Sequence, residues 1–293
     1  MSRACRIGGV TRWAWYKRKR RLAAEGSERR PRGRPASEAV DEGLAVKIEQ
    51  ILKEQAPVAF GYRRVWAQLK FKMGIPVNPK KVHRIMQIRG WQARPIRRPK
   101  RSSMEPRDPQ RTIVDPTAKV AVARPNERWC IDLTKFFVEG TGWVCLIPVL
   151  CCCSRKVLGW YLGIRGRAVE AFEAERDAAI REFGSLESMP SEIALRQDNG
   201  CIFLAKLFLD GIEHLKMETE YTPYHCPSAN GIAERFMKTI KEECVWQHRF
   251  RSIEEARAVI GAWILRYNTE RQHSSLGYLS PQQFLERLAT QAA

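Results

Sequence analysis

Hydrophobic positions between residues 41 and 93 recur every three or four residues, which is typical of amphipathic helices. The first predicted helix begins near Asp41, and the second covers residues 61–73 before the break "GIPV". The inward-facing positions are Leu44, Ile48, Ile51 and Leu52 in the first helix and Val65, Leu69 and Met73 in the second. The pattern predicts a small all-helical region.

A third helix is predicted directly after this break. Asn78 is a favourable N-cap residue and Pro79 fits the first helical position. Val82, Ile85 and Met86 form its apolar face, whereas Lys80, Lys81 and Arg84 point elsewhere. A helix with a basic amino-terminal turn suits the major groove of DNA, so we interpret residues 41–93 as a helix-turn-helix DNA-binding domain. A plain three-helix bundle is the alternative.

The segments that flank this region are basic. Thr11 is placed to cap a basic helix within residues 1–40, "TRWAWYKRKRRL". Residues 94–124 are rich in Pro, Arg and Ser and lack periodicity, which is typical of a linker. We therefore place a domain boundary near Arg124.

From residue 125 the pattern changes to short apolar runs that are typical of strands. Three runs, "RWCIDLTKFF", "WVCLIPVLCCC" and "KVLGWYL", predict a meander. Two further strands, "SEIALRQ" and "METEYT", are separated by helices predicted at 168–183 and 203–214. This order predicts an α/β domain with a mixed sheet over residues 125–293.

Charge is distributed unevenly between these two parts. Residues 1–125 hold 31 Lys and Arg against 10 Asp and Glu, a net charge of +21, whereas residues 126–293 hold 20 against 22, a net charge of −2. A polyanion is the natural partner of the first part, because Lys and Arg that neutralise phosphates release counterions from nucleic acid. A basic surface that serves only solubility is the less informative interpretation.

The composition excludes several classes of protein. A chain of 293 residues with 44% hydrophobic content can bury a sizeable core, and no apolar run approaches the ~18 residues of a membrane span. The nine cysteines lack the paired spacing of a zinc module, so we expect reduced, mostly buried thiols. We expect a cytoplasmic protein without a signal peptide or membrane partner.

Two aspartates occupy unusual positions in the predicted strands. Asp132 lies in the middle of the first strand, on the same side as Cys130 and Thr134, and Asp198 ends the strand that leads into "QDNG". Burying either carboxylate unpaired would cost several kcal/mol. Each therefore needs a cation or access to solvent, and Asn199 and Gly200 are expected to form the turn after Asp198.

A third carboxylate heads a predicted helix in "SANGIAERFMKTIKEEC". Its apolar face carries Ile232, Phe236 and Ile240. Glu234, Lys238 and Lys241 lie at i, i+4 and i+7 on the opposite side, within about 60° of one another. An acidic position thus leads a basic stripe.

The three acidic motifs resemble a known signature. Asp132 in "WCIDLT", Asp198 in "QDNG" and Glu234 in "NGIAERF" are similar to the Asp-Asp-Glu set of retroviral-integrase-like transposases. Lys241, "GYRRVWAQLK" and "YNTERQHSSLGYLSPQQF" also match, so that the resemblance covers nearly the whole chain. It is to bacterial insertion-sequence transposases of the OrfB class, whose catalytic half is a second reading frame.

The resemblance implies a ribonuclease-H-like core that brings the three carboxylates together around two Mg²⁺ or Mn²⁺ ions. Hard divalent ions prefer oxygen ligands, and a pair of them stabilises the attacking and leaving oxygens of a phosphoryl displacement. Asp132 would bridge both ions, with Asp198 and Glu234 completing one site each. Water as nucleophile would give cleavage, and a DNA 3′-hydroxyl would give strand transfer.

The resemblance also implies partners. We expect the ends of a mobile element and a target, both duplex DNA, a homo-oligomer on DNA, and an upstream-frame OrfA-type product or fusion in a bacterial nucleoid. Candidate DNA contacts are Lys80, Lys81, Arg84, Lys238, Lys241 and Arg271. We expect His273 to serve a local structural or DNA-backbone role and not to bind metal, because no second histidine lies at ligand spacing.

Two other functions stay open at this point. One is a stand-alone, structure-selective nuclease with the same type of core, and the other is a DNA-binding regulator whose catalytic site is vestigial. The intact acidic triad argues against the regulator.

Overall fold

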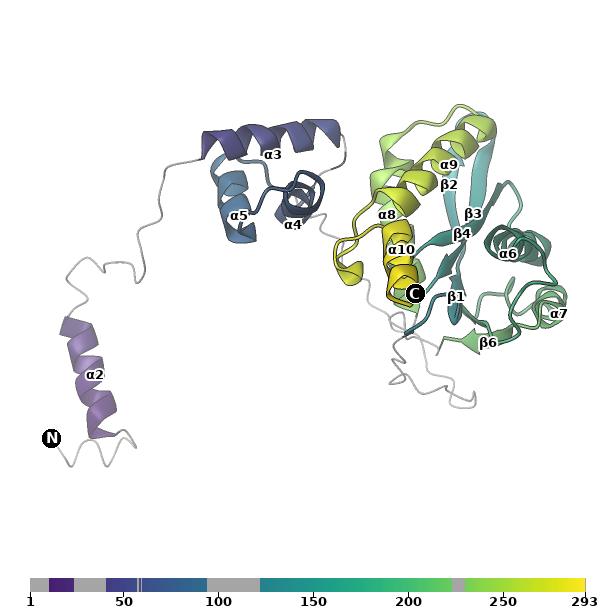
Figure 1. The fold of residues 1–293 in the computed structure, drawn as a ribbon, viewed down its shortest axis with the longest axis horizontal. Coiled ribbons are helices and arrows are strands. Elements are labelled where there is room, and N and C mark those ends of the chain that lie inside the picture. Colours follow the sequence, from purple (N-terminus) through teal and green to yellow (C-terminus); the bar gives the residue numbers. More distant parts are fainter. Residues whose placement is uncertain are drawn as a thin grey trace. The chain divides into compact units, whose positions relative to one another are not determined.

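The computed structural model describes residues 11–23, 41–56, 58, 60–93, 122–222 and 230–292 (Figure 1). The chain divides into two compact units, Met1–Ala45 and Val46–Ala293. The first contains helix α2 (Arg12–Ala23), and the backbone N–H of Ala14 donates to Oγ1 of Thr11 at 3.3 Å. The basic helix with a Thr11 cap is therefore confirmed, whereas most of the predicted linker, residues 94–121, lies outside the described residues.

The next described part is helical, as predicted. Its elements are α3 (Glu42–Glu54), α4 (Tyr62–Ala67), the π-helix η1 (Gln68–Lys72) and α5 (Pro79–Ile88). Its buried apolar side chains include Ile48, Ile51, Val65, Leu69, Val82, Ile85 and Met86. α4 packs against α5. The predicted inward faces are thus largely correct.

One inward position was wrong. Met73 is 38% exposed, although it lies eight residues after the buried Val65. The cause is η1, whose wider turn places Met73 beyond the helix and off the face that Leu69 continues. A period of 3.6 residues does not foresee such a turn.

The cap of α5 is confirmed. Oδ1 of Asn78 accepts the backbone N–H of Lys80 at 2.9 Å, and Pro79 occupies the first turn. Lys80 is exposed, and Lys81 and Arg84 are half-buried. The amino-terminal turn of α5 therefore carries a basic side chain that is open to solvent.

The second described part is a mixed sheet covered by helices. Its strands are β1 (Arg128–Ile131), β2 (Thr134–Val138), β3 (Gly142–Cys151), β4 (Val157–Gly163), β5 (Ala194–Gln197) and β6 (Glu218–Tyr221). β1 and β2 both pair antiparallel with β3, which pairs antiparallel with β4 on its other side. β1 also pairs parallel with β5, and β5 pairs parallel with β6. The predicted meander and mixed sheet are confirmed.

Helices cover both faces of this sheet (Figure 1). They are α6 (Ala168–Phe183), α7 (Lys206–His214), α8 (Gly231–Glu243), α9 (Ile253–Thr269) and α10 (Pro281–Ala292), with the short 3-10 turns η3 (Val245–Gln247) and η4 (Ser274–Leu276). Successive side chains along a strand point to opposite faces of the sheet and so pack into two different cores. Cys130 packs with residues of α8 and α9, whereas Trp129 and Ile131 pack with residues of α6 and α7. α8 is thereby held beside β1.

Two element boundaries differ from the prediction. The first strand was expected to be continuous, but it is interrupted at Asp132, whose Oδ1 accepts the N–H of Leu133 at 2.7 Å. The helix expected from residue 203 begins at Lys206 instead. Phe203 lies in a turn, where its N–H donates to the carbonyl of Gly200. The carbonyl of Phe203 accepts a hydrogen bond from Nε2 of the buried Gln197 at 3.1 Å.

Two expectations about chain chemistry can be compared with the described residues. Their seven cysteines are all free thiols, and six of them are buried; only Cys201 is exposed. No helix in the described ranges has the length and apolar character to span a membrane.

Candidate active site

Asp132 lies in the break between β1 and β2. It is half-buried, and the neighbouring residues on either side, Ile131 and Thr134, remain in the sheet. The hydrogen bond from the N–H of Leu133 fixes one carboxylate oxygen. The break thus releases the backbone from the sheet ladder and orients the side chain.

Asp198 follows β5 directly, on the strand next to β1. Its Oδ1 accepts the N–H of Gly200 at 2.9 Å, which closes the predicted turn. A Cβ at Gly200 would lie 2.9 Å from that same oxygen, so a larger residue there would push the carboxylate of Asp198 from this position. Nδ2 of Asn199 donates to the carbonyl of Thr222 at 2.7 Å and joins this turn to the end of β6.

Glu234 lies in the first turn of α8 and is exposed. The helix buries Ala233, Phe236 and Ile240 against the sheet, with Ile232 only half-buried. Glu234 therefore lies on the side of α8 that the sheet does not cover. Residues 223–229, which lead into the helix, lie outside the described residues.

The three carboxylates interact electrostatically. The pKa of Asp132 is raised to about 6: burial raises it most, the hydrogen bond from the N–H of Leu133 lowers it, and the charges of Asp198 and Glu234 raise it. The charge of Lys241 lowers the same pKa. The charges of these three neighbours therefore act on Asp132 through the fold, although they are distant from it in the sequence.

The donor set suits a hard divalent cation. Three carboxylates with one partly desolvated member supply the oxygen ligands that Mg²⁺ and Mn²⁺ prefer, and their mutual repulsion favours a bound cation. Within the described ranges no group of three or more His, Cys, Asp or Glu side chains is gathered tightly enough to hold an ion as it stands. The chemistry of the side chains therefore fits the metal, while their coordination remains a proposal.

The predicted basic residues of α8 have different surroundings. Nζ of Lys238 lies 3.6 Å from Oε1 of Glu242, one turn along the helix. Lys241 is half-buried and acts on the charge of Asp132. Both lysines are half-buried, and of the two only Lys241 is among the charges that act on Asp132.

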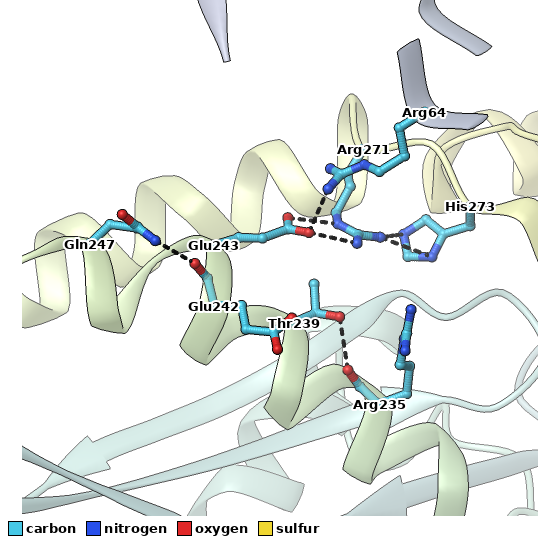
Figure 2. Close-up of polar contacts among 8 residues, drawn as sticks. All are labelled: Arg64, Arg235, Thr239, Glu242, Glu243, Gln247, Arg271 and His273. Atoms are coloured by element: carbon cyan, nitrogen blue, oxygen red, sulfur yellow. Dashed lines mark hydrogen bonds and ion pairs between the residues drawn. The ribbon is translucent and has the colours of Figure 1, made fainter. Parts of the chain in front are cut away.

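Arg271 is engaged by a residue that the sequence did not single out. Its Nε and Nη2 donate to the two carboxylate oxygens of Glu243, both at 2.9 Å (Figure 2). Nη1 of Arg64 donates to the same Glu243 at 2.8 Å. These partners are 28 and 179 residues from Glu243 along the chain, so no local pattern reveals the cluster. A contact of Arg271 with DNA would require it to give up part of this arrangement.

His273 is held neutral inside the same cluster. Burial and the charges of Arg271, Arg64 and Arg155 lower its pKa to about 3. Its ring packs edge-on against Tyr267 with centroids 4.9 Å apart. The geometry favours the structural role over the phosphate contact.

Comparisons with known families agree with this architecture. An HTH-like domain model matches residues 39–100, and two integrase core domain models match residues 122–227 and 215–281. The matches to the integrase core span the sheet and α8, and identify the α/β part as an integrase core domain.

Individual relatives are transposases. The chain is 30% identical over 266 residues to the transposase InsD for insertion element IS2A/D/F/H/I/K of Escherichia coli, covering 88% of this chain and 83% of the relative. InsD for IS2-9 of Escherichia coli strain K12 matches at 30% identity, with coverages of 88% and 81%. Among solved structures, the HTLV-2 integrase catalytic core domain in complex with magnesium matches with a TM-score of 0.43 and 18% identity, over 55% of this chain and 97% of that one.

The similarity to the InsD proteins extends over most of both sequences, including the helical region and the core. The chain therefore belongs to the family of insertion-element transposases with an integrase core.

Proposed function

We propose that this transposase cleaves DNA at the ends of a mobile element and joins them to a target, using Asp132, Asp198 and Glu234 as ligands of two Mg²⁺ or Mn²⁺ ions. Two observations support the proposal: Asp132 and Asp198 follow the neighbouring parallel strands β1 and β5, and the charges of Asp198 and Glu234 raise the pKa of Asp132. These residues come from three separate elements: the break after β1, the turn after β5 and the first turn of α8.

Each element contributes a defined property to the site. The β1–β2 break frees Asp132 from the sheet, and the Leu133 N–H fixes one oxygen. The turn at Gly200 fixes one oxygen of Asp198. When bound, a pair of divalent ions stabilises the developing charge on the attacking and leaving oxygens of the phosphodiester. The protein residues orient the ligands and Lys241 supplies a positive charge beside them.

The helical region is proposed to bind duplex DNA. Residues 1–125 carry the whole charge excess, and the HTH-like match includes α5. Lys80 is exposed next to the capped amino-terminal turn, where a recognition helix meets base edges and phosphates. We propose Lys80, Lys81 and Arg84 as contacts of this helix, residues 41–93 as the domain, and residues 94–124 as a basic linker to the core.

The proposed setting follows from the family. We propose that the protein acts in the bacterial cytoplasm as a homo-oligomer assembled on DNA, together with an upstream-frame OrfA-type product or fusion. Size-exclusion chromatography with light scattering, with and without element-end DNA, tests the oligomer. A single copy bound per DNA end in a cleavage-competent complex would contradict it.

The main experiment replaces each carboxylate without changing its size. Asp132→Asn, Asp198→Asn and Glu234→Gln should each lose cleavage and strand transfer on element-end DNA with Mg²⁺, while binding of the same DNA stays within about twofold, because the lost charge is a metal ligand and not a phosphate contact. Asp210→Asn is the matched control, since Asp210 is exposed on α7. It should retain both activities.

The outcomes separate the functions considered above. Strand transfer at the wild-type rate by any of the three variants would show that the substituted residue is not part of the metal site. Cleavage by the wild type without joining, on any branched DNA, would favour a structure-selective nuclease. DNA binding with neither reaction, under every metal tested, would favour a regulator with a vestigial site.

A further inference from the structure

A cavity in the unit Val46–Ala293 is strongly basic. It has a volume of about 490 Å³ and is bordered by α4, the turn between β3 and β4, α8 and residues 271–278. Its lining includes Arg63, Arg64, Arg155, Arg235, Arg271 and His273. No Asp or Glu contributes to the lining. Positive charge therefore collects around one cavity that is partly open to solvent.

One carboxylate in the described part of the chain pairs with arginines of this lining. Glu243 pairs with both Arg64 and Arg271, each at 2.8 to 2.9 Å. Among the described residues no acidic side chain pairs with Arg155 or Arg235. Figure 2 shows the Arg235 side chain pointing from α8 toward His273, and thus into the space beneath the Arg64–Glu243–Arg271 cluster. Two guanidinium groups thus face the cavity without a counter-charge.

The pKa values of Arg64 and His273 also indicate a positive electrostatic potential in the cavity. Arg64 has a pKa lowered to about 10, first by burial, with Arg271 and Arg235 lowering it further while Glu243 raises it. The neutral state of His273 has a related cause, since Arg155 is one of the charges that lower its pKa. Adding an anion to this cavity would relieve repulsion that the protein alone leaves in place.

The walls of the cavity are held in fixed conformations. Arg155 has φ of 63° and Tyr278 has φ of 66°, in the left-handed region that bulky residues rarely adopt. Each is held by a turn hydrogen bond, from the N–H of Arg155 to the carbonyl of Cys151 at 2.9 Å and from the N–H of Tyr278 to the carbonyl of His273 at 2.8 Å. Such conformations persist where the surroundings over-determine them, often at ligand-binding sites.

We propose that this cavity binds a backbone phosphate of the DNA strand on which the transposase acts, through the guanidinium groups of Arg155 and Arg235. The proposal rests on the proposed function, because it takes DNA as the substrate. Arg235 directly follows Glu234 on α8, about 100° around the helix, so the cavity is separate from the carboxylates and adjacent to them. A strand with one phosphate at the carboxylates has further phosphates along its backbone to fill a neighbouring basic cavity. Arginine is suited to such a contact because its planar fork binds phosphate oxygens in pairs.

The first test measures DNA binding by the full chain without chemistry. The parent protein carries Asp132→Asn, and fluorescence anisotropy on an element-end duplex is recorded across a KCl series. Arg155→Gln with Arg235→Gln should weaken binding at 100 mM KCl by roughly tenfold and reduce the slope of log affinity against log salt by about one, as expected for one lost phosphate contact. Arg176→Gln with Arg181→Gln is the charge-matched control, because both arginines are exposed on α6 and do not line the cavity. It should leave the slope unchanged.

A second measurement identifies the phosphate. Uncharged methylphosphonates are placed one at a time along the duplex; one position should weaken binding by the parent but cause no further loss with the double variant. Arg235→Lys should recover part of the affinity, since it keeps the charge without the fork. Thermal melts of every variant confirm folding.

Several outcomes would overturn the proposal. An unchanged salt slope in a folded double variant would show that the two arginines do not contact DNA. Equal sensitivity of the parent and the double variant to every methylphosphonate would show the same. Inorganic phosphate that stabilises the parent and not the double variant, with DNA binding unchanged, would assign the cavity to a free anion. Binding is measured in a protein that lacks the Asp132 carboxylate, so these results do not depend on whether the three carboxylates are catalytic.

Discussion

Arg64 and Glu243 form an ion pair of 2.8 Å between α4 and the last turn of α8, although 179 residues separate them in sequence. Arg271 binds the same carboxylate from the segment after α9, at 2.9 Å. All three side chains are less than a third exposed. The pair joins the helical region to the helix that carries Glu234, so a residue outside the core contributes to its stability.

Loss of this carboxylate should destabilise the protein. Glu243→Gln leaves Arg64 and Arg271 largely buried without their counter-charge, and we expect the free energy of unfolding to fall by about 3 kcal/mol. Urea unfolding at pH 7 measures it. Glu49→Gln is the control, because the Glu49–Lys53 pair is exposed and its loss should cost under about 0.5 kcal/mol. Equal effects of the two changes would contradict the account.

The cluster of Glu243 with Arg64 and Arg271 also predicts how the stability of the protein depends on pH. Its two arginines hold the pKa of Glu243 below the ordinary value, even though burial acts to raise it. A lowered folded-state pKa adds stability above the unfolded-state value of about 4.3, and that stability is lost as the pH falls through the folded-state value. The difference between wild type and Glu243→Gln should therefore shrink below pH 4. A difference that grows on acidification would have the wrong sign.

Glu175 should produce the opposite dependence. It is fully buried in α6, neither carboxylate oxygen has a hydrogen-bond partner among the described residues, and burial raises its pKa to about 8. The folded state keeps a proton that the unfolded state releases above about pH 4.3, so stability falls from that pH up to about 8. Glu175→Gln removes this fall. Thermal melts at pH 5 and pH 8 should show the variant gaining over wild type as the pH rises, and a constant difference would show that Glu175 titrates normally.

Lys80 tests the proposed recognition helix. Lys80→Ala in the full chain should weaken binding to all duplex sequences and lower the salt slope by about one, because we propose that this exposed lysine in the first turn of α5 contacts phosphate. The matched control is Lys53→Ala, whose lysine is exposed on α3 and pairs with Glu49. If both variants bind DNA as the wild type does, α5 is not the DNA-binding element.

Lys241 should set the pH range of the reaction. Its charge lowers the pKa of Asp132, so Lys241→Gln should raise that pKa further above its ordinary value and shift the acidic limb of the pH–rate profile to higher pH. Lys241→Arg keeps the charge and should keep the limb near its wild-type position. Lys238→Gln removes an equal charge from the same helix, beside Glu242, and should not move the limb. A shift common to Lys238→Gln and Lys241→Gln would indicate a general charge effect.

Local patterns predicted much of this fold correctly. The cap at Asn78, the helix over residues 168–183 and the strand ending at Gln197 follow from side-chain chemistry and periodicity within a few residues. These features depend on near neighbours in the chain. The turn at Asp198 and Gly200 was predictable for the same reason.

Features set by distant contacts or by unusual backbone were missed. The break at Asp132 depends on a hydrogen bond that competes with the sheet, and the π-turn in η1 displaced Met73 from its expected face. The cluster of Arg64, Glu243 and Arg271 requires three elements to meet in space. Only the family resemblance linked Asp132, Asp198 and Glu234 before the fold was known. The effect of Asp198 and Glu234 on the pKa of Asp132 depends on contacts between distant parts of the chain.

The central claim is that Asp132, Asp198 and Glu234 share a divalent metal. Its most direct test is a Mn²⁺ titration of the full chain bound to element-end DNA, measured by isothermal titration calorimetry. Wild type and Asp210→Asn should bind Mn²⁺ with the same affinity, whereas Asp132→Asn, Asp198→Asn and Glu234→Gln should each bind it at least about tenfold more weakly, since each lacks one charged oxygen ligand. Equal Mn²⁺ affinity in the wild type and all three carboxamide variants would contradict the claim.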